Sequence, residues 1–337
     1  PRTDWMYRTA EEKGLNGRSL LYPRGKVLGG CSSINGMLYL RGQAADYDGW
    51  RQMGNVGWAW DDVLPYFKKS ENYEPGENEL HAQGGLLNVS KLRSPGSIND
   101  IFFEAARENQ YKILDDLNGV VDGPDFEGMG YYDVTHKNGE RWSTARAFLD
   151  TAIERSNLTV VTHAHTEKVI IEDNEAKLVR FNVKNKTNQI KANKEIILSA
   201  GAFGSPQILL MSGIGPIDKL KPHGIEQVHE LPGVGENLQD HIDYVMGYNS
   251  NVKDNIGFSV MGTFRMIGEI YKYITKRRGM ITTNYAESGG YFYTDKSEPS
   301  PDIKLTFVLA DNVEKEYGAV NIDLATGEYT PIETSEE

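Results

Sequence analysis

Residues 23–48 read PRGKVLGGCSSINGMLYLRGQAADYD, and the interpretation of the whole chain starts from this stretch. Gly29 and Gly30 are followed by small polar residues at 31–35 and by an apolar run at 37–40. Glycines allow a close backbone approach and a positive φ, and neighbouring amides and hydroxyls offer donors to an anion. The stretch therefore predicts a loop that holds a diphosphate at one end and packs a flat ring at the other. A tight turn is the alternative for the glycines and serines alone.

A second glycine-rich stretch, SAGAFGSPQILLMSGIGP, occupies residues 199–216. Together, and in this order, the two stretches resemble the first and second signatures of the glucose-methanol-choline (GMC) flavoprotein oxidoreductases. Two long motifs are more specific than a lone glycine pattern. The likeness extends from the N-terminus to about Gly318 and is strongest to the choline-dehydrogenase-like branch.

The resemblance implies FAD as the cofactor and assigns it a set of residues. The implied cofactor-binding residues are Val27, Gly29, Gly30, Cys31, Asn35, Gly36, Met37, Leu38, Thr166, Ala200 and Gly201. Thr166 matches a position that meets the adenine end, although a turn residue is the alternative there. Ile34 stands where some members carry a histidine bonded to the flavin, so the resemblance implies noncovalent FAD. The catalytic residues stay unknown, because the family's histidine and its partner lie beyond this likeness.

Composition narrows the possible partners. The 337 residues carry a formal net charge of −12, which argues against nucleic acid, since phosphate contacts need clustered Lys and Arg. Cys31 is the only cysteine, so no intramolecular disulfide can form. No apolar run is long enough for a transmembrane segment, and no targeting signal is visible in this sequence, so localisation stays undetermined. His163 and His165 alternate without a third ligand, so no metal site is expected.

Hydrophobic periodicity predicts an α/β chain. Helices are expected from Asp61 or Asp62 to Ser70, from Ser97 along Ile98, Ile101, Phe102, Ala105 and Ala106, from Thr144 to Ile153, from Pro206 to Met211 and from Thr263 to Lys276. The last helix is expected to turn Phe264, Ile267, Ile270, Tyr271 and Ile274 inward. Strands are expected at Leu158–Thr162, Lys168–Ile171, Lys177–Lys184, Glu195–Leu198, Gly289–Tyr293 and Ile303–Leu309. Turns are expected at Asp173-Asn174 and Lys186–Asn188, and loops at Glu74–Gly85 and Leu114–Gly139.

The order of these segments matches, by resemblance, a FAD-binding dinucleotide fold joined to a substrate domain with an antiparallel sheet. Residues 1–89 and 158–241 would form the FAD-binding portion, and 90–157 and 242–318 the substrate portion. Residues 319–337 form an acidic stretch that departs from the family pattern and is expected to be a frayed or foreign tail. No G-x-G-x-x-G occurs in the sequence. Because the family carries it upstream of the first signature, the fold is expected to be incomplete, without its first βαβ unit, and truncated at both ends.

The resemblance implies an enzyme that oxidises the CH–OH group of a small primary alcohol, choline- or sugar-like, by hydride transfer to flavin. The electron acceptor stays open among a quinone, a dye and O₂, so dehydrogenase and oxidase are both possible. A flavin-containing hydroxynitrile lyase of the same fold is one alternative, and an inactive fragment or pseudoenzyme is another. The 337-residue chain alone is expected to be inactive.

Overall fold

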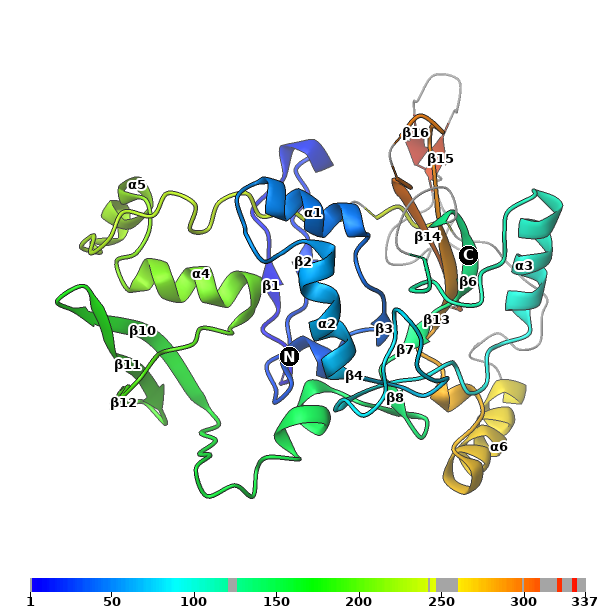
Figure 1. Cartoon of the computed structure of the whole chain (residues 1–337), viewed down its shortest axis with the longest axis horizontal. Coiled ribbons are helices and arrows are strands. Elements are labelled where there is room, and N and C mark those ends of the chain that lie inside the picture. Colours follow the sequence, from blue (N-terminus) through cyan, green and yellow to red (C-terminus); the bar gives the residue numbers. More distant parts are fainter. Residues whose placement is uncertain are drawn as a thin grey trace. The chain divides into compact units, whose positions relative to one another are not determined.

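The computed structural model describes residues 2–120, 126–241, 243–246, 260–298, 300–309, 320–322 and 329–331. The chain divides into two compact units. The first comprises Pro1–Arg155 and Val245–Glu337, and the second comprises Ser156–Tyr244 (Figure 1).

A three-stranded antiparallel sheet forms one centre of the first unit. Strand β13 (Ala286–Phe292) lies between β6 (Gly128–Tyr131) and β14 (Ile303–Val308). Helix α3 (Ile98–Glu108) packs beside this sheet, and buries Phe103 and Ala106 against Met129 (Figure 1). The side chain of Tyr132 packs against Gly289, and a Cβ added to Gly289 would lie 2.0 Å from the tyrosine oxygen. A glycine in the central strand therefore makes room for a buried tyrosine.

The inward face of helix α3 overlaps the predicted face only in part: Ala106 is buried and Phe102 packs against the same core, as the periodicity predicts. Asn99 and Phe103 are buried, whereas the side chain of Ile101 is 58% exposed. Asn99 Nδ2 donates to Glu287 Oε2 at 2.6 Å, and its Oδ1 accepts from Ser288 Oγ at 2.6 Å. This buried polar contact selects the Asn99 face, which an apolar pattern cannot reveal.

A second core of the first unit lies between α1 (Ala44–Gln52) and α2 (Trp60–Ser70). Ala44, Trp60 and Val63 are buried there. In the first turn of each helix, a carboxylate accepts a hydrogen bond from the backbone amide of the residue that precedes the helix. Asp46 accepts from Gln43 N at 2.8 Å, and Asp62 accepts from Ala59 N at 3.1 Å. The predicted helix 61–70 is confirmed, with Pro65 tolerated inside it.

Short strand pairs connect these two cores within the first unit. All are antiparallel except β4–β5, and the pairs are β1 (Tyr7–Arg8) with β2 (Leu21–Tyr22), β3 (Leu38–Tyr39) with β7 (Asp133–Val134), β4 (Glu71–Tyr73) with β5 (Leu87–Val89), and β8 (His136–Lys137) with β9 (Glu140–Arg141). The loop expected at 114–139 therefore contains β6, β7 and β8. These strands are two to four residues long, too short for a periodic pattern.

The second unit contains an antiparallel meander. It consists of β10 (Ala164–Glu172), β11 (Glu175–Val183) and β12 (Lys186–Lys191). The Asp173-Asn174 turn is confirmed, with φ of 53° and 62°. The other turn lies at Lys184-Asn185 and not at Lys186–Asn188, because residues 186–191 pair along β11.

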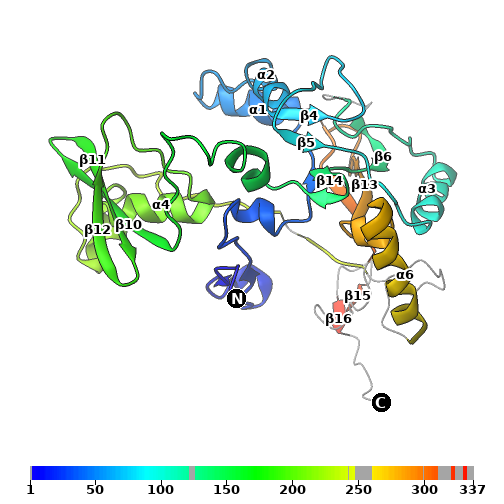
Figure 2. The ribbon, with the colours of Figure 1, turned by 90° about the horizontal axis from the view of Figure 1, so that it is seen from below.

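Helix α4 (Gly201–Met211) accompanies the meander (Figure 2). Ser212, at its end, accepts from the amide of Val169 in β10 at 2.8 Å. A short helix α5 (Ile217–Leu220) and a 3₁₀ turn, Lys221–His223, follow. The expected helix 206–211 is thus the second half of α4.

Two strands expected in this unit are not strands in the structure. Residues 158–162 and 195–198 make no ladder with any described residue. The side chains of Val161 and Ile197 are 55% and 74% exposed. A strand requires a hydrogen-bonded neighbour, so an apolar β-branched sequence alone does not form one.

Two helices of the first unit also depart from expectation. The segment from Thr144 forms a single π-helical turn, Ala145–Leu149, in place of a helix to Ile153. Helix α6 (Val260–Lys276) is present, but Ile267, Tyr271 and Ile274 are 61%, 67% and 68% exposed. Ile270, at 44%, is exposed as well, and the side chain of Phe264 lies outside the described residues. None of these described side chains faces inward.

Among residues 265–276, the part of α6 whose side chains the structure describes, the buried residue is Glu269, which is 4% exposed. Its carboxylate accepts from Met280 N at 2.7 Å and pairs with Lys272 at 2.6 Å. The 3₁₀ turn Met280–Thr282 that follows the helix supplies this amide. Satisfying a buried carboxylate therefore fixes the helix rotation.

The last described elements are β15 (Val320–Ile322) and β16 (Tyr329–Pro331), which pair antiparallel inside the expected acidic tail. The expected strands 289–293 and 303–309 are confirmed as β13 and β14.

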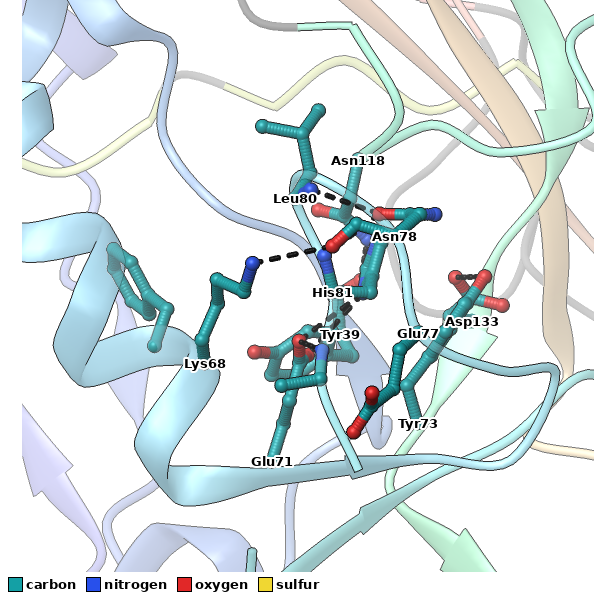
Figure 3. A network of polar contacts seen from close by, with 12 residues as sticks. Tyr39, Lys68, Glu71, Tyr73, Glu77, Asn78, Leu80, His81, Asn118 and Asp133 are labelled. Carbon is teal, nitrogen blue, oxygen red and sulfur yellow. Dashed lines mark hydrogen bonds and ion pairs between the residues drawn. The ribbon is translucent and has the colours of Figure 1, made fainter. Parts of the chain in front are cut away.

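Beside β4 lies a buried network of charged side chains (Figure 3). Glu71, which is 0% exposed, pairs with Arg41 Nη2 at 2.8 Å and with His81 Nδ1 at 3.3 Å. The other ring nitrogen of His81 lies 3.1 Å from Asp116 Oδ2, and the ring stacks on Tyr73. His81 is fully buried, although 74–85 was expected to be a surface loop. The imidazole of His81 thus contacts a carboxylate at each of its two ring nitrogens, and these contacts hold the 74–85 loop in place.

The network shifts the pKa of each titratable partner. Burial alone would lower the pKa of His81, but its hydrogen bonds to Asp116 and Glu71 raise it above 6.5. Burial would raise the pKa of Glu71, but the His81 hydrogen bond and the Arg41 charge hold it below 4.5. His81 is therefore held as a cation between two carboxylates.

We predict a pH-dependent loss of stability in His81→Gln. Because the folded pKa of His81 is raised, its contribution is complete below the unfolded value of 6.5 and is lost as the pH rises through the folded pKa. The variant should lose on the order of 3 kcal/mol below pH 6.5, and less at alkaline pH. Urea unfolding across this pH range measures the difference. A difference that does not change with pH would mean that His81 is neutral in the folded protein.

Candidate functional site

The cofactor loop, residues 25–37, has a backbone that depends on its two glycines. Gly29 and Gly30 have φ of 87° and 54°, in the left-handed region. The amide of Gly30 donates to Val27 O at 2.9 Å, and a 3₁₀ turn, Gly30–Ser33, follows. The amide of Asn35 then donates to Cys31 O at 2.8 Å. The loop is therefore a closed double turn and not an extended connection.

The two glycines differ in the space around them. A Cβ on Gly29 would lie 2.5 Å from Ser33 Oγ and 3.2 Å from Ala145 N. A Cβ on Gly30 would meet no atom within 4 Å. Gly29 is therefore required by the packing of the protein itself, whereas Gly30 borders open space in which a ligand can approach the backbone.

The loop also presents unused donors and a buried acceptor. Among the described residues, the amides of Gly29, Cys31 and Gly36 have no hydrogen-bond acceptor. Asn284 donates through Nδ2 to Gly36 O at 2.9 Å, and its Oδ1 is buried without a donor. An open glycine, free amides and an unpaired acceptor fit a cofactor that carries both phosphates and a ring with polar edges.

The loop is attached to the strand region 133–136, about 100 residues further along the chain. Leu38 and Tyr39 pair with β7, and the amide of Thr135 donates to Met37 O at 2.9 Å. His136 Nε2 lies 3.1 Å from Met37 Sδ. Burial and then the charge of Arg141 lower the pKa of His136 to about 4, so its ring is neutral at physiological pH.

A hollow of about 500 Å³ adjoins this side of the loop. Its lining residues are Met37, His136, Gly139, Glu140, Arg141, Ser143, Arg146, Tyr273, Ile281, Thr282 and Thr283. Glu140 pairs with Arg146 at 2.7 Å and with Arg277 at 3.1 Å. Arg141 has no carboxylate partner among the described residues, so the walls carry a positive excess.

The expected cofactor residues fall in both units. Val27, Gly29, Gly30, Cys31, Asn35, Gly36, Met37 and Leu38 belong to the first unit, and Thr166, Ala200 and Gly201 to the second. Within the first unit they form one continuous loop and strand. In the second unit, Thr166 pairs with Phe181 in the meander, and Ala200 N donates to Ser205 Oγ at the start of α4. Gly201 has φ of 81° and open space around it.

Several residues that the sequence did not assign to the site contact the loop, among them His136, Arg141, Thr144 and Asn284. A partial signal exists for two of them, because Arg141 and Thr144 lie in the run ERWSTARAFL, just before an expected helix start. No local pattern marks Asn284. Among the residues that the structure describes, no group of three His, Cys, Asp or Glu side chains could hold a metal ion.

Comparison with known proteins assigns this arrangement to a family. Residues 6–243 match the family model described as GMC oxidoreductase. The chain belongs to the GMC oxidoreductase family. It is 41% identical over 310 residues to an alcohol dehydrogenase [acceptor] from Pseudomonas putida. The matched region covers 91% of this chain and 55% of that protein. It is 36% identical to the mitochondrial choline dehydrogenase of Homo sapiens, over 93% of this chain and 52% of that protein.

Solved structures share the fold. A FAD-dependent oxidoreductase from Chaetomium thermophilum matches with a TM-score of 0.79 and 28% identity, over 88% of this chain and 54% of that one. A pyridoxine 4-oxidase from Mesorbium loti matches with a TM-score of 0.75 and 26% identity, over 92% and 56%. The fold is thus a mixed α/β GMC oxidoreductase fold, and the chain spans about half the length of these relatives. FAD is the cofactor expected of the family. In the parts of the chain that the structure describes, no helix is long and apolar enough to span a membrane.

We predict that alanine separates the roles of the two glycines. Left-handed backbone strain should cost each variant about 1 kcal/mol of unfolding free energy. Gly29→Ala should lose more, because its Cβ also meets Ser33 and Ala145. Gly30→Ala should lose no more than the strain, yet bind FAD more weakly. Urea unfolding and FAD titration, both on the flavin-free form of the product of the complete natural reading frame, measure the two effects. Equal stability losses with equal FAD affinities would contradict the assignment.

Proposed function

We propose that the natural protein binds FAD at the cofactor loop and oxidises the CH–OH group of a small primary alcohol. The observation that carries this proposal is the open space at Gly30 beside the unpaired amides of Gly29, Cys31 and Gly36. Membership of the GMC family supports the cofactor. Here "natural protein" means the product of the complete natural reading frame.

We infer further that the cofactor contacts both signatures. Val27 to Leu38 would hold the flavin and its diphosphate, and Thr166, Ala200 and Gly201 the nucleotide end. Residues 1–89 and 158–241 would then form the FAD-binding portion of a dinucleotide fold. The antiparallel sheet of β6, β13 and β14 supports a substrate portion built from 90–157 and 242–318.

Bound FAD supplies the acceptor for the hydride that leaves the alcohol carbon. The residues of this chain would bind and orient the FAD. Free amides would donate to its anionic groups, and Asn284 Oδ1 would accept from a donor on the ring edge. His136 is neutral because its pKa is lowered to about 4. The group that takes the hydroxyl proton is not assigned to any residue of this chain.

The substrate class follows from the relatives and not from the site. Two relatives are named an alcohol dehydrogenase [acceptor] and a choline dehydrogenase, and a structural relative a pyridoxine 4-oxidase. We therefore propose a small alcohol, choline- or sugar-like, as the substrate. Ile34 carries no nucleophilic atom, so the FAD would be held without a covalent bond.

We predict that the purified natural protein is yellow and that an alcohol bleaches it. Anaerobic addition of choline, glucose or simple primary alcohols should reduce the flavin and leave it reduced, because no O₂ is present to reoxidise it. Absorbance of the flavin measures the reaction. Flavin that stays oxidised with every alcohol would exclude oxidation of these substrates and favour a redox-silent role such as hydroxynitrile lysis.

Two controls accompany this experiment. Acid precipitation should release all the flavin into the supernatant, since Ile34 cannot bond to it, and colour retained in the washed pellet would contradict noncovalent binding.

The 337-residue chain expressed alone should neither bind FAD tightly nor reduce a dye, because it contains no G-x-G-x-x-G to present helix N-terminal amides to the diphosphate. Dye turnover by that chain would place the working residues inside it.

A further inference from the structure

We propose that Arg141 and Thr144 are positioning residues that hold the cofactor loop in its binding shape before FAD arrives. The proposal rests on the proposed function in one respect: the loop must be the FAD site. The contacts themselves are independent of any ligand.

Thr144 fixes the glycine end of the loop. Ser32 Oγ donates to Gly29 O at 2.6 Å and accepts from Thr144 N at 2.9 Å. Thr144 Oγ1 donates to Gly29 O at 3.2 Å and lies 3.0 Å from Ser32 Oγ. The same residue thus contacts the carbonyl of the left-handed glycine and the side chain of the following turn. Rotation of the Gly29 peptide would break these contacts together.

Arg141 fixes the other end. Its Nη1 donates to Ser32 O at 3.1 Å, to Asn35 O at 2.8 Å and to Asn35 Oδ1 at 2.9 Å. Asn35 Oδ1 also accepts from Met37 N at 3.1 Å. These bonds determine which end of the Asn35 amide faces the protein. Its Nδ2 has no acceptor among the described residues and is left to donate to a ligand.

The charge of Arg141 is available for this task. Glu140, its neighbour in the chain, is already paired with Arg146 and Arg277. Arg141 has no carboxylate partner among the described residues, so it donates to loop carbonyls. Bonds from a charged donor are stronger than bonds between neutral groups.

The consequence for binding is a reduced entropic cost. A glycine-rich loop samples many conformations when free, and a ligand that must order it binds more weakly. Residues 141 and 144 come more than 100 positions after the loop. They therefore couple the shape of the cofactor site to correct folding of the β8–β9 region.

The test uses matched variants of the natural protein. Thr144→Val removes the hydroxyl at nearly constant shape, and Thr144→Ser keeps it. Arg141→Gln removes the charge, and Arg141→Lys keeps it. Arg277→Gln is the control: it removes a nearby charge that pairs with Glu140, and Arg277 contacts no loop residue in the described part of the chain. Hydrogen exchange of loop amides in the flavin-free protein and FAD titration are measured for each.

Arg141→Gln and Thr144→Val should both speed exchange at residues 32–37. Arg141→Gln should weaken FAD binding about tenfold or more, since a hydrogen bond from a charged group contributes about one decade. Thr144→Val should weaken it about fivefold, because its hydrogen bond joins neutral groups. Thr144→Ser should restore most of both, Arg141→Lys should retain part, and Arg277→Gln should resemble the wild type. Equal behaviour of Thr144→Val and Thr144→Ser, or unchanged exchange in Arg141→Gln, would overturn the inference. If the wild type binds no FAD, the proposed function fails, while the exchange data still decide whether the loop is held.

Discussion

The site depends on a connection between residues 29–39 and residues 133–145, two segments that the sequence separates by about 100 positions. Strand β3 pairs with β7, Thr135 bonds to Met37, and Arg141 and Thr144 bond to the turn between Gly29 and Asn35. A Cβ on Gly29 would lie only 3.2 Å from Ala145, tighter than an ordinary van der Waals contact. The protein therefore shapes the loop at these contacts, while Gly30 borders open space and the amides of Gly29, Cys31 and Gly36 have no acceptor among the described residues. A backbone that approaches a ligand closely has to be supported in this way, because it has no side chains of its own to hold it.

The sequence predicted much of the fold and the loop itself. Long local patterns were reliable: α2, β10, β11, β13 and β14 appear where periodicity and turn residues place them. Family membership was predicted from two signatures and is confirmed. The loop glycines could be chosen because two long stretches together resemble the family's signatures, whereas the glycines and serines alone are typical of a tight turn.

The errors share one physical cause, which is that burial is decided by partners distant in the sequence. Residues 158–162 and 195–198 have strand composition but no ladder among the described residues. The apolar stripe of α6 is exposed, because the Glu269 carboxylate is the group that faces the protein. His81 looked like a loop residue and is buried between Glu71 and Asp116. The position of Arg141 in the run ERWSTARAFL did not reveal which residues it contacts, since its acceptor Asn35 O lies 106 residues away.

The central claim is that FAD lies against the cofactor loop, and Cys31 allows it to be tested at one residue. Cys31 is a free, exposed thiol inside the loop. Its alkylation by a maleimide can be followed in the natural protein by peptide mass spectrometry, with and without FAD. The account predicts that saturating FAD slows labelling of Cys31 strongly, because the cofactor would cover the open backbone at Gly30 and the unpaired amide of Cys31 itself. An unchanged labelling rate in protein that demonstrably holds FAD would place the cofactor elsewhere and contradict the account.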